Sequence, residues 1–184
     1  MADVSVSDIF MSDVSVIDST SAPIEVAIEE SGSSEQFLRL QLVAGTTVLL
    51  PVHQLAEVLT IETHQIVPIP HLPSWVMGIY NWRGEILWML DVGHLGGLTP
   101  WYQQSHTSIH SVAVLQMAED AKPKTLGLVV SKIEEIEWCD PNQIQPFTAV
   151  TSKLASLIQG YWCKPNGEAL AVLDGAAVIA AMPA

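Results

Sequence analysis

Six histidines and two cysteines are the side chains in this sequence that could bind a metal or attack a substrate. His106 and His110 have the i, i+4 spacing of a helical ligand pair, but no glutamate follows His106 in an H-E-x-x-H pattern. Cys139 and Cys163 form no C-x-x-C pair and lie far from any histidine in sequence. G-x-S-x-G and P-loop patterns are also absent. The sequence therefore predicts no catalytic residue, no metal and no cofactor, and the protein is not expected to be an enzyme.

Arg83 is the residue that most suggests recognition, because the sequence contains only two arginines. It lies in the segment Asn81-Trp82-Arg83-Gly84, between the apolar stretches Met77–Asn81 and Glu85–Asp91. This pattern predicts two strands joined by a bend at Arg83-Gly84. An arginine there is either a solvated cation or a recognition residue whose guanidinium grips carboxylates or carbonyls. Trp82 belongs to a residue type that is enriched in binding hot spots.

The charge distribution excludes some partners. A net charge of −13 argues against nucleic acid and against an anionic membrane surface. Residues 1–34 hold seven acidic residues and no lysine or arginine, so we expect a disordered acidic tail. A tether, or a Val-Ser segment that adds to a sheet edge, is the alternative for this tail. With no apolar run of about 20 residues and no signal peptide pattern, the protein is expected to be cytoplasmic and not inserted in a membrane.

From Glu35 onward the pattern is that of β-strands. Leu38, Leu40 and Leu42 alternate with other side chains, as in a half-buried strand, and Ala44–Thr47 reads as a hairpin turn. After Gly175, the alanine-rich run 176–182 predicts a short helix.

An internal repeat organises these strands. The segment 55–58 matches 133–136, because both have apolar residues around a glutamate. The segment 65–68 matches 143–146, because both begin with Gln-Ile and end with proline. Both matches have an offset of 78 residues. Gly84-Glu85 and Leu90-Asp91 match Gly167-Glu168 and Leu173-Asp174 at an offset of 83. The repeat predicts two similar units of about five short strands, each closed into a barrel and packed on a shared core. Asp91 and Asp174 are then expected to be a repeated turn or cap rather than a catalytic pair.

The segment from Gly78 to Gly84, with the strand and aspartate that follow it, resembles the G-x-x-N-L-R-G motif of CheW-like domains. Phe37–Leu42, Val52–Val58 and Pro68–Pro70 fall in the order of that family, and the resemblance covers about residues 35–181. It implies an all-β fold of two packed SH3-like five-stranded barrels at residues 35–184. It also implies a non-enzymatic adaptor between the cytoplasmic tips of chemoreceptors and the regulatory domain of a CheA-type histidine kinase.

The resemblance also implies which residues bind partners. Arg83, supported by Asn81 and Gly84, maps to the receptor-facing region, and Glu57 and Leu55 map to a second partner-contacting segment.

The sequence departs from the family motif at Trp82, which stands where the family has leucine, and at Gly93, where the family has arginine. These departures are typical of divergent members, such as coupling proteins of type IV pilus motility or phototaxis. A small-molecule-binding sensory β-barrel module is the alternative function, because the domain is rich in aromatic residues.

Overall fold

The computed structural model describes residues 34–104, 108–118, 122–146 and 152–183. The expected acidic tail, apart from Ser34, and His106 of the expected histidine pair lie outside the described residues. Within the described part of the chain, no helix has the length and apolar character needed to cross a bilayer.

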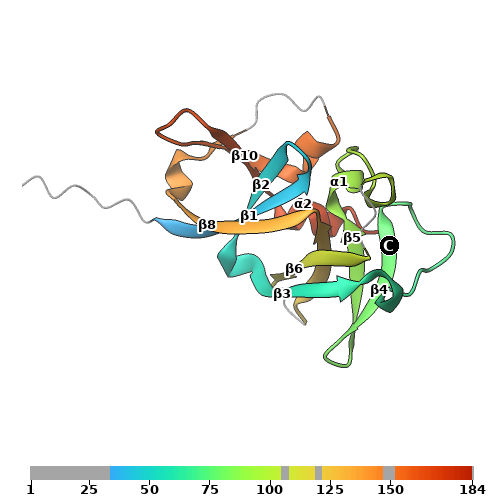
Figure 1. The fold of residues 1–184 in the computed structure, drawn as a ribbon. Coiled ribbons are helices and arrows are strands. Elements are labelled where there is room, and N and C mark those ends of the chain that lie inside the picture. Colours follow the sequence, from blue (N-terminus) through green and yellow to red (C-terminus); the bar gives the residue numbers. More distant parts are fainter. Residues whose placement is uncertain (1–33, 105–107, 119–121, 147–151, 184) are drawn as a thin grey trace, which may run out of the picture. The chain divides into compact units, whose positions relative to one another are not determined.

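Eleven strands form within the described residues, with only short helices between them (Figure 1). The helical segments are α1 (Val92–Leu95), α2 (Gly175–Ala180), η1 (Val52–Gln54), η2 (Thr63–Gln65), η3 (Trp101–Gln103), η4 (Pro141–Gln143) and η5 (Leu154–Leu157). In chain order the strands are β1 (Glu35–Val43), β2 (Thr46–Pro51), β3 (Leu55–Glu62), β4 (Val76–Trp82), β5 (Glu85–Asp91), β6 (Ile109–Met117), β7 (Lys124–Val130), β8 (Lys132–Cys139), β9 (Gln145–Pro146), β10 (Ile158–Cys163) and β11 (Ala169–Leu173).

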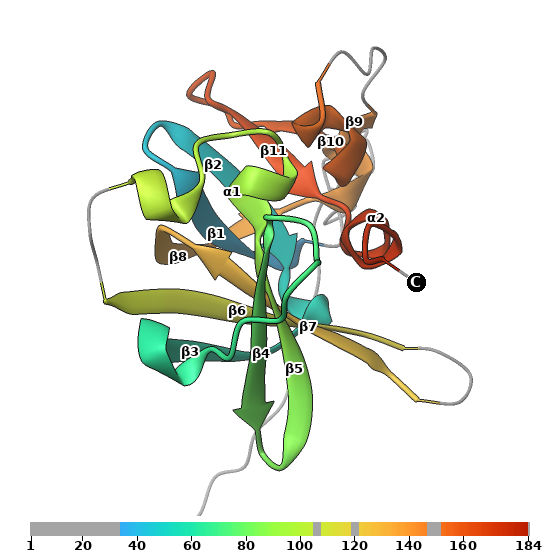
Figure 2. The ribbon, with the colours of Figure 1, turned by 90° about the vertical axis from the view of Figure 1, so that its right-hand side faces the viewer.

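The strands form two curled sheets, which confirms the all-β, two-lobed fold predicted from the sequence (Figure 2). One sheet has the order β8-β1-β2-β11-β10-β9, and the other has the order β3-β6-β7-β5-β4. The first sheet has six strands rather than the expected five, because the two-residue strand β9 pairs with β10.

The two sheets are not successive halves of the chain. The repeat runs from β1 to α1 and again from β6 to α2, yet the β1–β2 hairpin belongs to the sheet of β8–β11. In return, the β6–β7 hairpin belongs to the sheet of β3–β5. Each exchange creates one parallel pair, β2 with β11 and β5 with β7. The repeat correctly predicts two similar sheets, but each sheet is completed by a hairpin of the other repeat.

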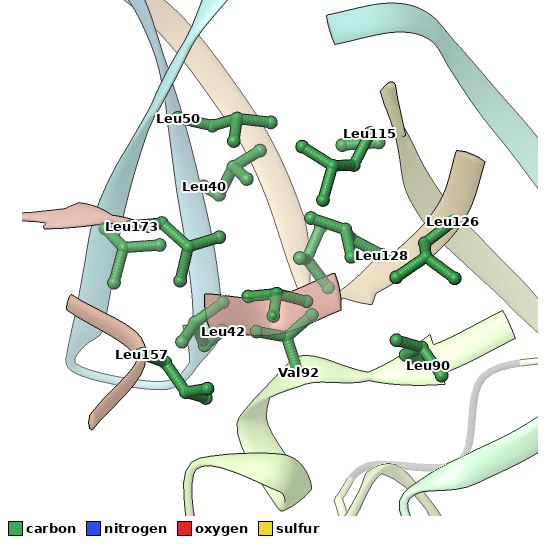
Figure 3. Packing of buried hydrophobic residues seen from close by; sticks show 14 of the residues in the cluster. Leu40, Leu42, Leu50, Leu90, Val92, Leu115, Leu126, Leu128, Leu157 and Leu173 are labelled. Atoms are coloured by element: carbon green, nitrogen blue, oxygen red, sulfur yellow. The ribbon is translucent and has the colours of Figure 1, made fainter. Parts of the chain in front are cut away.

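Three apolar clusters follow from this arrangement. One lies within the six-stranded sheet around Phe37 and Trp162, and one lies within the five-stranded sheet around Met89 and Val112. The third and largest joins the two sheets. Figure 3 shows its leucines pointing into one space from both sides, Leu40, Leu42, Leu50 and Leu173 from one sheet and Leu90, Leu115, Leu126 and Leu128 from the other.

Strand β1 explains how one strand serves two clusters. Leu38, Leu40 and Leu42 face the shared cluster, while Phe37 on the opposite face enters the cluster of its own sheet. Successive side chains of a strand alternate between faces, so β1 contributes to a cluster on each side. Removal of each such side chain from water stabilises the fold by about 1.5–3 kcal/mol.

The tryptophans differ widely in burial. Trp162 is buried, but Trp138 on the edge strand β8 is 61% exposed. Trp138 pairs with Gln36 near the open end of β1, beyond the reach of the shared cluster.

Candidate partner-binding site

The β4–β5 hairpin carries four of the six residues that the sequence singles out for partner binding. Its two-residue turn has positive φ at both positions, 54° at Arg83 and 84° at Gly84, as a type I′ turn requires. Asn81 Oδ1 accepts a hydrogen bond from the Gly84 amide at 2.9 Å, which closes the turn. In both views the tip of this hairpin projects beyond the neighbouring strands (Figure 1 and Figure 2).

Glu57, on β3, lies against this hairpin although 25 or more residues separate them in sequence. The Trp82 indole Nε1–H donates to Glu57 Oε2 at 2.8 Å, and Arg83 Nη2 donates to the same oxygen at 2.9 Å. The Arg83 guanidinium also lies 5.2 Å from the centre of the Trp82 ring, in cation–π range. We refer to Glu57, Trp82 and Arg83 as the hairpin cluster.

The electrostatics of the hairpin cluster favour an ionised glutamate. The Trp82 hydrogen bond is the largest cause that lowers the pKa of Glu57, and the charge and hydrogen bond of Arg83 lower it further. Partial desolvation opposes this shift without reversing it. The Arg83 side chain stays 69% exposed, so the guanidinium has donors left for a partner.

Leu55 does not join this cluster. It packs against the shared core between the sheets, and an irregularity in the β3–β6 register separates it from Glu57. The structure thus brings together Asn81, Trp82, Arg83 and Glu57, with Gly84 in the turn, and places Leu55 in a supporting position.

Two exposed apolar side chains on β3 and β5 were missed by the sequence reasoning. Val58, which follows Glu57, is 47% exposed, and Ile86, which pairs with Asn81 across the hairpin, is 68% exposed. The expected two-residue turn sets that register, so the position of Ile86 opposite Asn81 could have been found from the sequence.

The equivalent turn of the second repeat is built differently. Gly167 also has a positive φ, 86°, but a longer loop from Lys164 precedes it. There Lys164 contacts Glu137 and lies 3.7 Å from Glu168, and Arg39 makes ion pairs with Glu134, Glu137 and Glu168 at 2.7–3.3 Å. The side chains of both cations are less than a fifth exposed. Both cations beside this turn, Arg39 and Lys164, are therefore already paired with carboxylates of the same chain.

Asp91 and Asp174 occupy equivalent positions and act as helix caps, as predicted. Asp91 accepts from the His94 amide at the start of α1, and Asp174 accepts from the Ala176 and Ala177 amides at the start of α2. Within the described ranges, no group of three or more His, Cys, Asp or Glu side chains could hold a metal ion.

The fold and the hairpin motif agree with a comparison of the chain with known families. The CheW-like domain family matches residues 38–182, and the chain therefore belongs to that family.

Individual relatives are similar over shorter segments. A probable chemotaxis protein CheW of Rhizobium etli is 29% identical over 86 residues, 47% of this chain and 51% of that protein. Chemotaxis protein CheW of Rhizobium meliloti is 29% identical over 85 residues, 46% of this chain and 50% of that protein. The matched segments thus span about half the length of these curated relatives.

The fold is similar to that of the scaffolding protein TtCheW from Thermoanaerobacter tengcongensis. The two structures superimpose with a TM-score of 0.64, over 77% of this chain and 89% of that one, at 19% sequence identity. At this identity the likeness concerns the fold.

Proposed function

We propose that the protein is a non-enzymatic, cytoplasmic adaptor that couples the cytoplasmic tip of a chemoreceptor to a CheA-type histidine kinase. The observation that carries this proposal is the hairpin cluster, in which an exposed arginine is held in place by an indole and a carboxylate. A positioned guanidinium with unused donors suits the carboxylates and backbone carbonyls of a protein partner.

Membership of the CheW-like family supports the proposal, as do the names of the relatives, which are chemotaxis and scaffolding proteins. Val58 on β3 and Ile86 on β5 add exposed apolar surface on the same sheet. Exposed apolar side chains together with a charged anchor are the composition expected of a protein-binding surface. Partner binding would act by favouring one arrangement of the kinase, and so bias its activity.

The test is the affinity of the purified protein for a chemoreceptor cytoplasmic fragment from the same cell. Arg83→Ala is expected to weaken this binding by about 2–5 kcal/mol, because the guanidinium contacts are lost and Glu57 is left without its ion pair. Circular dichroism establishes that the variant is folded.

The matched control is Lys132→Ala. Lys132 is also an exposed cation with one carboxylate partner, Glu134 at 3.5 Å, but it lies on β8 of the other sheet. Its removal is expected to leave receptor binding unchanged. Equal receptor binding by folded Arg83→Ala and by the unaltered protein would contradict the receptor-binding role of Arg83.

A small-molecule-binding role is supported by a different feature, a cavity at the junction of the two sheets.

A further inference from the structure

A cavity of about 640 Å³ lies where strand β1 of the six-stranded sheet meets β6 and β7 of the five-stranded sheet, with η3 beside it. This volume is within the range of about 300–1,000 Å³ typical of small-molecule sites. Two polar side chains are buried among the described residues, Asp91 at 3% and His110 at 4% exposure, and both line this cavity. Polar groups buried around a cavity are the usual composition of a ligand site.

His110 is held in the cavity wall by a hydrogen bond at one ring nitrogen. The Thr63 hydroxyl donates to the Ser108 carbonyl at 3.2 Å, and Thr63 Oγ1 lies 3.0 Å from His110 Nε2. Nε2 of the imidazole is therefore engaged by Thr63 in either tautomer. Burial lowers the pKa of His110, with Asp91 opposing the shift, so the imidazole is held in its neutral form. The cavity wall therefore contains a neutral imidazole.

The described lining residues disfavour charged ligands. None of them is a lysine or arginine, so they offer no counter-charge to an anion. Asp91 is the acidic side chain of the lining, and its two oxygens accept from the amides of His94 and Trp101 at 3.0 and 2.8 Å. A cation would have to compete with these hydrogen bonds.

Neutral polar groups and one indole remain for recognition. Gln41 and Gln103 supply amide groups, which both donate and accept, while the Ser131 hydroxyl is already hydrogen-bonded to the Leu42 carbonyl and to Gln104. Trp101 is held by edge-to-face contacts with His110 and Tyr102, at centroid distances of 4.9 and 6.0 Å. A fixed indole among amides and a hydroxyl suits a ring with hydroxyl groups at its rim and C–H groups on its face.

We propose that this cavity is a binding site for a neutral hydroxylated ring of monosaccharide size, recognised by Trp101, Gln103 and the neutral imidazole of His110. The site is separate from the hairpin cluster, since it shares no residue with Glu57, Trp82 and Arg83.

The test is titration of the full chain with D-glucose and D-galactose, followed by the NMR signal of the Trp101 indole N–H. A saturable shift of this signal with at least one of the two sugars is expected. Gln103→Ala is expected to weaken binding about 3- to 10-fold, because one neutral hydrogen bond is lost. Trp101→Leu is expected to weaken it further; if that variant does not fold, Gln103→Ala still tests the site, because the Gln103 side chain is exposed.

Gln159→Ala is the matched control, since Gln159 is an exposed glutamine on β10 away from the cavity lining. It is expected to bind the sugar as tightly as the unaltered protein does. Absence of a saturable shift with both sugars up to tens of millimolar, or equal binding by Gln103→Ala and Gln159→Ala, would overturn the proposal. Tighter binding of glucose 6-phosphate than of glucose would overturn the assignment of a neutral ligand. Retained receptor binding by Gln103→Ala would separate this site from the proposed adaptor function.

Discussion

The two arginines have opposite environments, although both belong to the first repeat. Arg39 is surrounded by the carboxylates of Glu134, Glu137 and Glu168 and is mostly buried. Arg83 contacts one carboxylate and is mostly exposed. A guanidinium has five N–H donors, so Arg39 spends its donors inside the chain while Arg83 keeps several for a partner. This difference supports a stabilising role for Arg39 and the proposed recognition role of Arg83.

Trp82 is expected to control the ionisation of Glu57. Its indole hydrogen bond is the largest cause of the lowered pKa of Glu57, so Trp82→Phe should raise this pKa toward the ordinary value of a glutamate. A carboxyl whose pKa is lower in the folded state stabilises the fold above its unfolded-state pKa. That contribution is lost as the pH falls through the folded-state value. The measurement is an NMR titration of the Glu57 carboxyl below neutral pH.

Trp138→Phe provides the control for this titration, because Trp138 is an exposed tryptophan on β8, in the other sheet. It should leave the midpoint of Glu57 unchanged. The role of the indole is refuted when Trp82→Phe and Trp138→Phe give the same midpoint.

The sequence predicts the hairpin members of this site better than it predicts their contacts. Asn81, Trp82, Arg83 and Gly84 are consecutive, so any correct reading of the turn brings them together. Only the family resemblance identified Glu57 as a site residue. Its contact with Arg83 brings together β3 and the β4–β5 hairpin, and β3 and β4 are the two edge strands of the five-stranded sheet. Strand periodicity shows which face a residue occupies, but not how far a sheet curls.

At the scale of elements, two glycines mark where each sheet curls. Gly78 on β4 and Gly160 on β10 follow register irregularities at equivalent places in the two repeats. A Cβ atom on Gly78 would lie 2.2 Å from the Val67 carbonyl oxygen, and one on Gly160 would lie 2.3 Å from that of Gln145. In both repeats the preceding segment therefore crosses the strand at a distance that only glycine permits.

Gly160→Ala is therefore expected to destabilise the protein by about 1–3 kcal/mol, because the new methyl group collides with backbone rather than with a flexible side chain. The measurement is the free energy of unfolding in urea. Gln159→Ala, one residue earlier on the same strand, should change it by less than about 0.5 kcal/mol, since its side chain is exposed. Equal stability of the two variants would show that the backbone at Gln145 does not pass close to Gly160.

The strands themselves could be predicted, and their pairing could not. The β4–β5 hairpin, the β1–β2 turn and the C-terminal helix follow from local pattern, and they are observed within one or two residues of the predicted positions. The parallel contact of β2 with β11 joins residues more than 100 positions apart, Val48 with Ala171. Nothing in the local pattern of either strand selects that partner, because both are apolar on both faces and would suit any central position.

At the scale of the whole molecule, the exchange of hairpins makes the two repeats mutually dependent. Without β6 and β7, the strands β3, β4 and β5 lose every partner except the β4–β5 pair. Without β1 and β2, β8 loses its neighbour in the sheet. The shared cluster also draws its leucines from both repeats, Leu40 and Leu90 from the first and Leu115 and Leu173 from the second. An isolated two-stranded hairpin is marginally stable in water, so neither repeat retains a sheet with a covered apolar face.

Fragments 35–104 and 105–184, which correspond to the two repeats, are therefore expected to be unfolded when each is prepared alone. Mixed in equal amounts, they are expected to assemble into a one-to-one complex with the β-sheet content of the intact domain, because each supplies the hairpin that the other lacks. Circular dichroism and size-exclusion chromatography measure the two outcomes. The intact chain should unfold in one transition, since the shared cluster couples the sheets. A dispersed NMR spectrum from fragment 35–104 alone would show that this fragment folds by itself. That result would contradict the exchange of hairpins between the sheets, because it is the result expected of two independent lobes in tandem.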